Sequence, residues 1–89
     1  MSITVKATVN NPRGIHARPS SEIARTSLKY KSDITIKCDE RMANSKDVLQ
    51  LIMLELFEGS SVLIEATGED EEAAANEIKS LIEKAYNFD

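Results

Sequence analysis

Cysteine and histidine are scarce in this chain of 89 residues, and each scarcity argues against a class of site. The single cysteine, Cys38, leaves no internal disulfide and no cysteine-built metal site. The single histidine, His16, has no cysteine or suitably spaced carboxylate near it, so it is a weak ligand set. We therefore expect neither a metal ion nor a cofactor.

Long apolar runs and a basic face are also missing. A membrane-spanning helix needs about 20 consecutive apolar residues, and no run approaches that length. The N-terminus alternates polar and apolar residues, unlike a signal peptide. The net charge is -4 and the basic residues are scattered, which argues against nucleic-acid binding. The sequence predicts a cytoplasmic protein without membrane or nucleic-acid partners.

What the chain does contain is typical of one soluble globular domain. The hydrophobic fraction is 42% and the charged fraction is 29%. A chain of this length has room for a single core, so we expect one domain over residues 1–89.

The first part of the chain shows an alternating, strand-like pattern of apolar residues followed by a helical one. Residues 3–9 alternate apolar and polar side chains, which predicts a half-buried strand. A loop follows at residues 10–14, where Pro12 and Gly14 interrupt regular structure. Residues 17–29 fit a helix with Pro19 in its first turn. Its expected buried face consists of Ile23, Ala24, Ser27 and Leu28.

The second half continues with alternating elements. Residues 34–38 and 41–44 predict two strands, and residues 48–56 a short helix. Asp47 and Gln50 resemble a capping box at its start, and Gly59 is the expected C-terminal cap. A strand at residues 61–67 precedes a last helix beginning near Asp70. The expected core stripe of that helix is Ala74, Ile78, Leu81, Ile82 and Ala85.

The resulting order is βαββαβα. Each strand has one apolar face, and three helices are available to cover it. We therefore predict an α+β fold, a two-layer open-faced sandwich. Its sheet would have four mainly antiparallel strands, with the three helices on one face.

His16 is the strongest candidate for chemistry. It lies between a turn and a predicted helix start, where unpaired backbone N–H groups form an anion site. Arg18 adds a permanent cation, and both effects favour a neutral, nucleophilic imidazole. This setting suits a phosphoryl-accepting histidine. The alternative is an inert N-cap histidine at a surface turn. A catalytic triad is unsupported, because no second histidine would serve Ser20 or Ser21 as a base.

Residues 11–19, Asn-Pro-Arg-Gly-Ile-His-Ala-Arg-Pro, resemble the signature of HPr, the histidine phosphocarrier of the bacterial sugar phosphotransferase system. Residues 45–51 and 68–71 extend the resemblance. It implies that enzyme I, charged from phosphoenolpyruvate, phosphorylates Nδ1 of His16 and that enzyme IIA domains receive the group. It also implies that Arg18 assists and that the backbone amides of Ala17 and Arg18 hold the phosphoryl group. Such a protein is a phosphorylated intermediate rather than a turnover enzyme.

A partner surface is expected beside this site. Residues 48–54 are apolar on almost every side, so a short helix there must expose some of them, and contiguous exposed hydrophobic residues mark interaction sites. We expect partners, including regulatory proteins, to bind a monomer through the starts of the first and second helices. The expected interface residues are Ser21, Arg25, Val48, Leu49 and Ile52, with Arg25 and Lys29 at the rim.

Two departures from the family pattern stand out. Many relatives carry a regulatory serine at the start of the second helix, where this chain has Asp47, which cannot be phosphorylated by a serine kinase. Ser45 is expected to be a turn or capping hydroxyl, and residues 86–89 extend past a typical family end. Two alternatives remain open. One is a regulatory paralogue in a nitrogen- or carbon-control phosphorelay, and the other is a small α+β binding module without phosphoryl chemistry.

Overall fold

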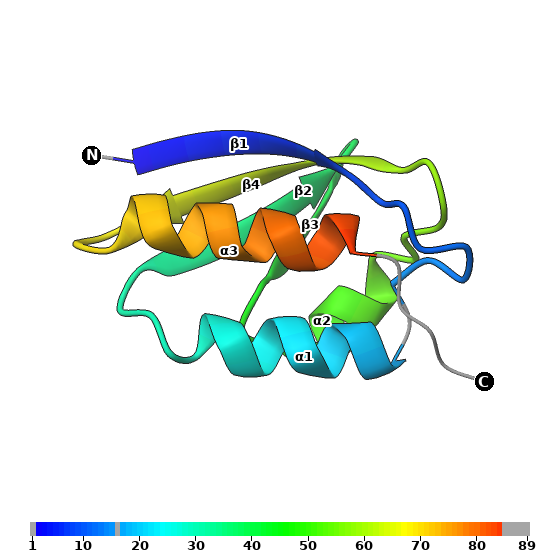
Figure 1. Ribbon diagram of the computed structural model, residues 1–89, viewed down its shortest axis with the longest axis horizontal. Helices are drawn as coiled ribbons and strands as arrows, with labels where there is room; N and C mark the ends of the chain where they lie inside the picture. Colours follow the sequence, from blue (N-terminus) through cyan, green and yellow to red (C-terminus); the bar gives the residue numbers. More distant parts are fainter. Residues whose placement is uncertain (1, 16, 85–89) are drawn as a thin grey trace.

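The computed structural model describes residues 2–15 and 17–84 and contains the expected order of elements (Figure 1). Along the chain these are a strand, a helix, two strands, a helix, a strand and a helix. Their bounds are β1 (Ser2–Thr8), α1 (Ala17–Ser27), β2 (Asp33–Cys38), β3 (Arg41–Asn44), α2 (Val48–Met53), β4 (Ser61–Thr67) and α3 (Glu71–Glu83).

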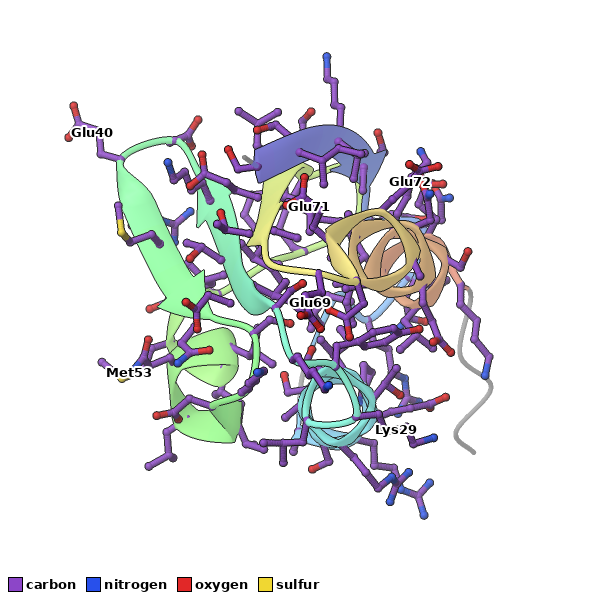
Figure 2. All side chains as sticks on the ribbon, turned by 90° about the vertical axis from the view of Figure 1, so that its left-hand side faces the viewer. Lys29, Glu40, Met53, Glu69, Glu71 and Glu72 are labelled. Carbon is purple, nitrogen blue, oxygen red and sulfur yellow. The ribbon has the colours of Figure 1, made fainter. Side chains whose placement is uncertain are left out.

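The four strands form one sheet in the order β1-β4-β2-β3, and every pairing is antiparallel. Ile64 of the inner strand β4 lies opposite Val5 of β1 on one side and opposite Ile36 of β2 on the other. The three helices cover one face of this sheet (Figures 1 and 2). The predicted open-faced α+β sandwich is confirmed.

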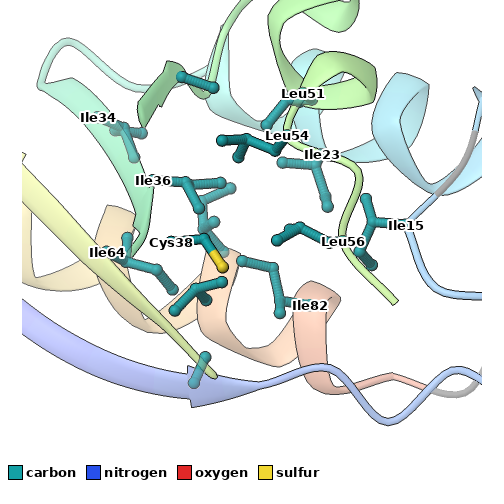
Figure 3. Packing of buried hydrophobic residues seen from close by; sticks show 14 of the residues in the cluster. Ile15, Ile23, Ile34, Ile36, Cys38, Leu51, Leu54, Leu56, Ile64 and Ile82 are labelled. Atoms are coloured by element: carbon teal, nitrogen blue, oxygen red, sulfur yellow. The ribbon is translucent and has the colours of Figure 1, made fainter. Parts of the chain in front are cut away.

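The core lies between the sheet and the helices, because alternate strand residues and one stripe of each helix are apolar. Ile36 and Ile64 of the sheet are fully buried, and Ile23, Leu51 and Ile78 meet them from the helices. Figure 3 shows this packing seen from close by. Each large apolar side chain buried in this way stabilises the fold by about 1.5–3 kcal/mol.

The first helix is shorter than its pattern predicts. It ends at Ser27, and Leu28, expected on the buried face, is 66% exposed. The chain tightens there, because the N–H of Lys29 donates to the carbonyl of Thr26 at 3.1 Å, three residues back. The N–H of Leu28 still donates to the carbonyl of Ala24 at 3.0 Å, so the tightening begins after Leu28, whose side chain lies outside the buried stripe of Ile23 and Ala24.

The second helix also ends early, at Met53 rather than near residue 56. Glu55 adopts the left-handed conformation that terminates it, with φ of 53°. The last carbonyls of a helix have no hydrogen-bond partner within it. Arg41 provides one for Leu54, because its Nη1 donates to the Leu54 carbonyl at 2.5 Å. Gly59 is therefore not the cap of this helix, and that prediction was wrong.

The last helix begins at Glu71, with Asp70 at its N-cap position. Ala74, Ile78 and Ile82 are buried as expected, whereas Leu81 is only half-buried and Ala75 takes its place in the core. Ala85 and residues 86–89 lie outside the described residues. None of the helices described, over residues 2–15 and 17–84, has the length and apolar character needed to cross a membrane.

Candidate functional site

His16 lies outside the described residues, and its neighbours in the chain define the candidate site. Ile15 before it is 3% exposed, and Pro19 after it is buried in the first turn of α1. Ala17 and Arg18 are exposed at the start of that helix. Two buried anchors, Ile15 and Pro19, thus fix the chain on either side of a solvent-facing helix start.

Gly14 allows the loop before this site to lie against the segment that follows α2. Its φ is +71°, and a Cβ there would lie 2.3 Å from the carbonyl oxygen of Leu56 and 2.8 Å from Cα of Phe57. The N–H of Ile15 donates to that same carbonyl at 3.1 Å. Only glycine fits this contact, since any side chain would force two backbones apart.

Asn11 closes the same loop from within. It is 1% exposed, and its Nδ2 donates to the carbonyl of Gly14 at 2.7 Å, while the Gly14 N–H donates back to the carbonyl of Asn11 at 2.9 Å. The sequence placed Asn11 in a loop and in the signature of residues 11–19, but it assigned no role to the side chain. Its position three residues before a glycine was the one local signal of this turn.

The outer face of α1 brings together residues named from the sequence. Ala17, Arg18, Ser21 and Arg25 line a shallow hollow of about 460 Å³, together with Glu22. Glu22 also pairs with Lys84 at 3.5 Å. No acidic residue occupies the first turn of α1, so nothing there offsets the positive end of the helix dipole. Arg18 lies at the helix start and Arg25 in the last turn of the same helix, and their guanidinium groups give this hollow a surface suited to an anion.

The second expected surface lies on α2, which packs beside α1 (Figure 1). Leu51 is fully buried, but Leu49 is 71% and Ile52 36% exposed, and Val48 is half-buried. Met53 is 73% exposed and points away from the ribbon in Figure 2. We call the exposed residues Leu49, Ile52 and Met53 the α2 patch.

Asp47 caps α2 as expected, because its Oδ1 accepts from the N–H of Gln50 at 3.2 Å. The capping box is altered, since the Gln50 side chain accepts from the N–H of Asn44 at 2.8 Å and donates to the Asp47 carboxylate at 3.3 Å. Ser45 caps nothing with its hydroxyl. It is fully buried and shares a 2.6 Å hydrogen bond with the hydroxyl of Ser27 in α1.

Within residues 2–15 and 17–84, no three histidine, cysteine, aspartate or glutamate side chains gather in a way that would hold a metal ion. Cys38, the last residue of β2, is buried in the core, with its Sγ 3.7 Å from Nη2 of Arg41. The chemistry of the candidate site therefore belongs to its imidazole, guanidinium and backbone N–H groups.

Comparison with known proteins matches this geometry to one family. A family model described as the PTS HPr component phosphorylation site matches residues 3–84. The phosphocarrier protein HPr of Borreliella burgdorferi is 41% identical over 78 residues, which cover 88% of this chain and 91% of that protein. The chain belongs to the HPr family.

Solved HPr structures agree in fold. A crystal structure of HPr from Bacillus anthracis has a TM-score of 0.88 over 92% of this chain and 98% of that chain, at 23% identity. A crystal structure of an HPr dimer from Thermoanaerobacter tengcongensis has a TM-score of 0.70 at 32% identity, covering 88% of this chain and 90% of that one. The resemblance of residues 11–19 to HPr is confirmed, and the chain is a phosphocarrier of the phosphotransferase-system type.

Proposed function

We propose that this HPr-family chain is a general phosphocarrier of the sugar phosphotransferase system, with His16 as the residue that carries the phosphoryl group. The observation that supports this most is the start of α1. It is anchored by Ile15 and Pro19, is free of acidic residues in its first turn, and exposes Ala17 and Arg18. The first backbone N–H groups of a helix have no partner within it, so they are available to phosphoryl oxygens.

The proposed step moves a phosphoryl group between two imidazoles. The lone pair on Nδ1 of neutral His16 attacks the phosphorus held by a histidine of enzyme I. The donor's nitrogen–phosphorus bond breaks as the new one forms, and its electron pair returns to the donor ring. A proton leaves the His16 ring and the donor ring gains one, so that both rings end neutral. Delivery to a histidine of enzyme IIA repeats these events in the opposite sense.

Three groups of this chain would stabilise the transferred phosphoryl group. The N–H groups of Ala17 and Arg18 would donate to its oxygens, and the Arg18 guanidinium would balance its charge. Each hydrogen bond to a charged group is worth about 1.5–3 kcal/mol. Arg18→Ala should therefore slow transfer by roughly one to two orders of magnitude without abolishing it, since the helix amides remain.

The proposed partner surface joins the two neighbouring helices. Arg18 and Arg25 on α1 would attract acidic partner surfaces, and the α2 patch would be buried in the complex. Ser21 lines the same hollow as these arginines, and Val48 begins the helix that carries the patch. Enzyme I and enzyme IIA would bind in turn, because both must reach the same imidazole. We further propose that the carrier works as a monomer in the cytoplasm.

The regulatory-serine position is part of this proposal. Asp47 caps α2 and carries one negative charge, where a phosphoserine would carry ≈ −1.5 to −2. Treatment with ATP and a serine kinase of the family should leave the native chain unlabelled, while Asp47→Ser accepts phosphate. Label on native Ser45 would contradict this, and the burial of Ser45 argues against it.

Reconstitution of the relay separates this function from its alternatives. The protein would be incubated with enzyme I and labelled phosphoenolpyruvate, and then with enzyme IIA domains of sugar-specific and nitrogen-control systems. A general phosphocarrier delivers label to the sugar-specific domains. Delivery to the nitrogen-control domain alone would indicate a regulatory paralogue. A chain that takes no label at all would be a binding module, and the proposal would then be wrong.

A further inference from the structure

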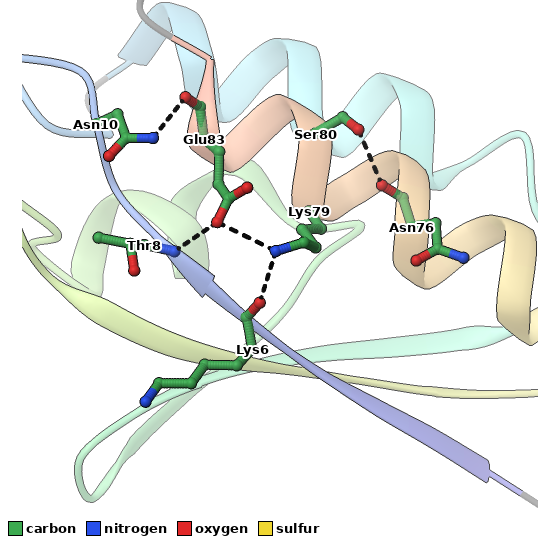
Figure 4. A network of polar contacts seen from close by, with 7 residues as sticks. All are labelled: Lys6, Thr8, Asn10, Asn76, Lys79, Ser80 and Glu83. Carbon is green, nitrogen blue, oxygen red and sulfur yellow. Dashed lines mark hydrogen bonds and ion pairs between the residues drawn. The ribbon is translucent and has the colours of Figure 1, made fainter.

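Two side chains of α3 cover part of the free edge of β1. Among the described strands, β1 pairs only with β4, so its other edge lies outside the sheet ladder. Such an edge presents N–H and C=O groups on which a further strand can pair. Here Glu83 Oε2 accepts from the N–H of Thr8 at 3.1 Å, and Lys79 Nζ donates to the carbonyl of Lys6 at 3.0 Å (Figure 4).

The two covered groups are consecutive along that edge. In an antiparallel strand, alternate residues direct both backbone groups to the same side, so Lys6 and Thr8 share the free edge. The Lys6 carbonyl is an acceptor and the Thr8 N–H is the next donor. Lys79 and Glu83 stand four residues apart and are joined at 3.2 Å. Together they present one donor and one acceptor, as a neighbouring strand would.

This pair is better fixed than an ordinary surface ion pair. The side chains of Lys79 and Glu83 are 39% and 32% exposed, whereas those of Lys31 and Glu69 are 81% and 84% exposed. Asn10 Nδ2 also donates to the Glu83 carbonyl at 3.0 Å. The N–H of Thr8, followed by Lys79, lowers the pKa of Glu83. The carboxylate is thus held in place as a charged acceptor.

We infer that Lys79 and Glu83 form an edge cap that prevents β1 from pairing with β1 of a second copy of this chain. A second copy is the relevant partner, because an antiparallel edge is complementary to itself about a two-fold axis. The uncapped part of β1, Ser2 to Val5, is shorter than a typical strand of about 5–6 residues. The edge cap follows from the contacts of α3 with β1 and does not depend on the proposed phosphoryl transfer.

The test compares two double variants with unchanged net charge. Lys79→Ala/Glu83→Ala removes the edge cap. Lys37→Ala/Glu65→Ala removes an ion pair of similar exposure, 38% and 41%, whose residues lie on the inner strands β2 and β4. Sedimentation velocity over a range of protein concentrations should show monomers for the native chain and the control. The cap variant should form a dimer whose fraction rises with concentration.

Hydrogen exchange locates the contact. In the cap variant the Thr8 amide should exchange faster than in the native chain at low concentration and become protected again as the dimer forms. Should the double variant fail to fold, Glu83→Gln alone removes the charged acceptor of the Thr8 N–H while Lys79 still covers the Lys6 carbonyl, and this variant should dimerise more weakly than the double variant but more than the native chain. The inference is overturned if the cap variant stays monomeric, if the native chain or the control dimerises equally, or if dimerisation leaves the Thr8 amide unprotected.

Discussion

At the scale of single residues, three of the buried serines, Ser20, Ser27 and Ser45, differ in how their hydroxyls are satisfied. The hydroxyls of Ser27 and Ser45 bond each other at 2.6 Å across α1 and the turn before α2. Ser20 is equally buried in α1, yet its Oγ has no hydrogen-bond partner among the described residues. A buried hydroxyl without a partner costs about 1–3 kcal/mol.

Ser20→Ala should therefore stabilise the protein by about 1 kcal/mol, because it removes an unsatisfied polar group from the core. Ser27→Ala is the matched control. It leaves the Ser45 hydroxyl without its partner and should destabilise by about 1–3 kcal/mol. Urea denaturation followed by circular dichroism measures both. A loss of stability in Ser20→Ala would mean that its hydroxyl is satisfied in solution.

Gly14 and Gly59 both have a positive φ, but only Gly14 is packed against another backbone. A Cβ on Gly14 would clash with Leu56 and Phe57, whereas a Cβ on Gly59 would meet nothing within 4 Å. Gly59→Ala should cost about 1–2 kcal/mol, the penalty of a left-handed residue. Gly14→Ala should cost more and should also slow phosphoryl acceptance, since the loop leads directly to His16. Equal unfolding free energies for the two variants would show that the backbone at Leu56 and Phe57 moves away from a Cβ on Gly14 without a loss of stability.

At the scale of elements, the apolar pattern of α2 predicts that a helix forms but not where that helix ends. The run from Val48 to Leu54 predicts a helix, and its apolar excess predicts that some side chains remain exposed. The predicted end of the helix, near residue 56, was wrong, because Glu55 and the distant Arg41 terminate α2 at Met53. Neither residue is a recognised helix-stop signal in sequence, and the contact between Arg41 and Leu54 exists only after β3 and α2 have packed.

The α2 patch can be tested with two exposed leucines on different surfaces. Leu49 on α2 is 71% exposed, and Leu63 on the open face of the sheet is 45% exposed. Leu49→Glu should lower kcat/KM for transfer from enzyme I at least tenfold, because it places a charge in the docking surface. Leu63→Glu should leave transfer unchanged, and both variants should remain folded. If Leu63→Glu slows transfer and Leu49→Glu does not, partners bind the open sheet face instead.

At the scale of the whole molecule, two carboxylates join segments that lie far apart in the chain: Glu83 bonds Thr8, and Asp70 bonds Lys31 and Ser32. Asp70 accepts from the Ser32 hydroxyl at 2.5 Å and from the N–H groups of Lys31 and Ser32, and these bonds lower its pKa. The Thr8 N–H and Lys79 do the same for Glu83. On Tyr30, a hydrogen bond to Glu77 raises the pKa of the phenol.

These shifts fix the sign of the pH dependence. A carboxyl group with a lowered pKa contributes its full stabilisation at pH values above its ordinary pKa. This stabilisation is lost as the pH falls through the lowered pKa. The free energy of unfolding should thus be level near neutrality and decline below about pH 5. Asp70→Asn should reduce stability at pH 7 and make the acid decline shallower. Glu40→Gln, at a position that faces solvent in Figure 2, is the control and should change neither. An unaltered acid decline in Asp70→Asn would contradict the role of Asp70.

The raised pKa of Tyr30 acts in the opposite direction. The stabilisation that Tyr30 contributes to the fold is complete at pH values below its ordinary pKa of 10.0. It is lost as the pH rises through the raised pKa. Acid and alkaline unfolding therefore report on different contacts of the same fold.

Much of the molecule follows from its sequence, and the remainder has a common physical origin. The alternation in β1, β2 and β4 and the stripes of α1 and α3 are local periodicities, and they predicted the layers of the sandwich. The contact of Leu56 with the loop at Gly14 and the edge cap were not predictable, because each acts through a partner that is distant in the chain. The signature around His16 was readable for the opposite reason, since its residues are consecutive.

The central claim is that His16 carries the phosphoryl group, and the most direct test is to locate the phosphate after reaction with enzyme I and phosphoenolpyruvate. Phosphorus and nitrogen NMR of the native protein should show one acid-labile phosphoryl group on Nδ1 of the single imidazole. His16→Ala should take up none while keeping the circular dichroism spectrum of the native fold. Phosphate retained by His16→Ala, or an acid-stable phosphate on another residue of the native chain, would contradict the account.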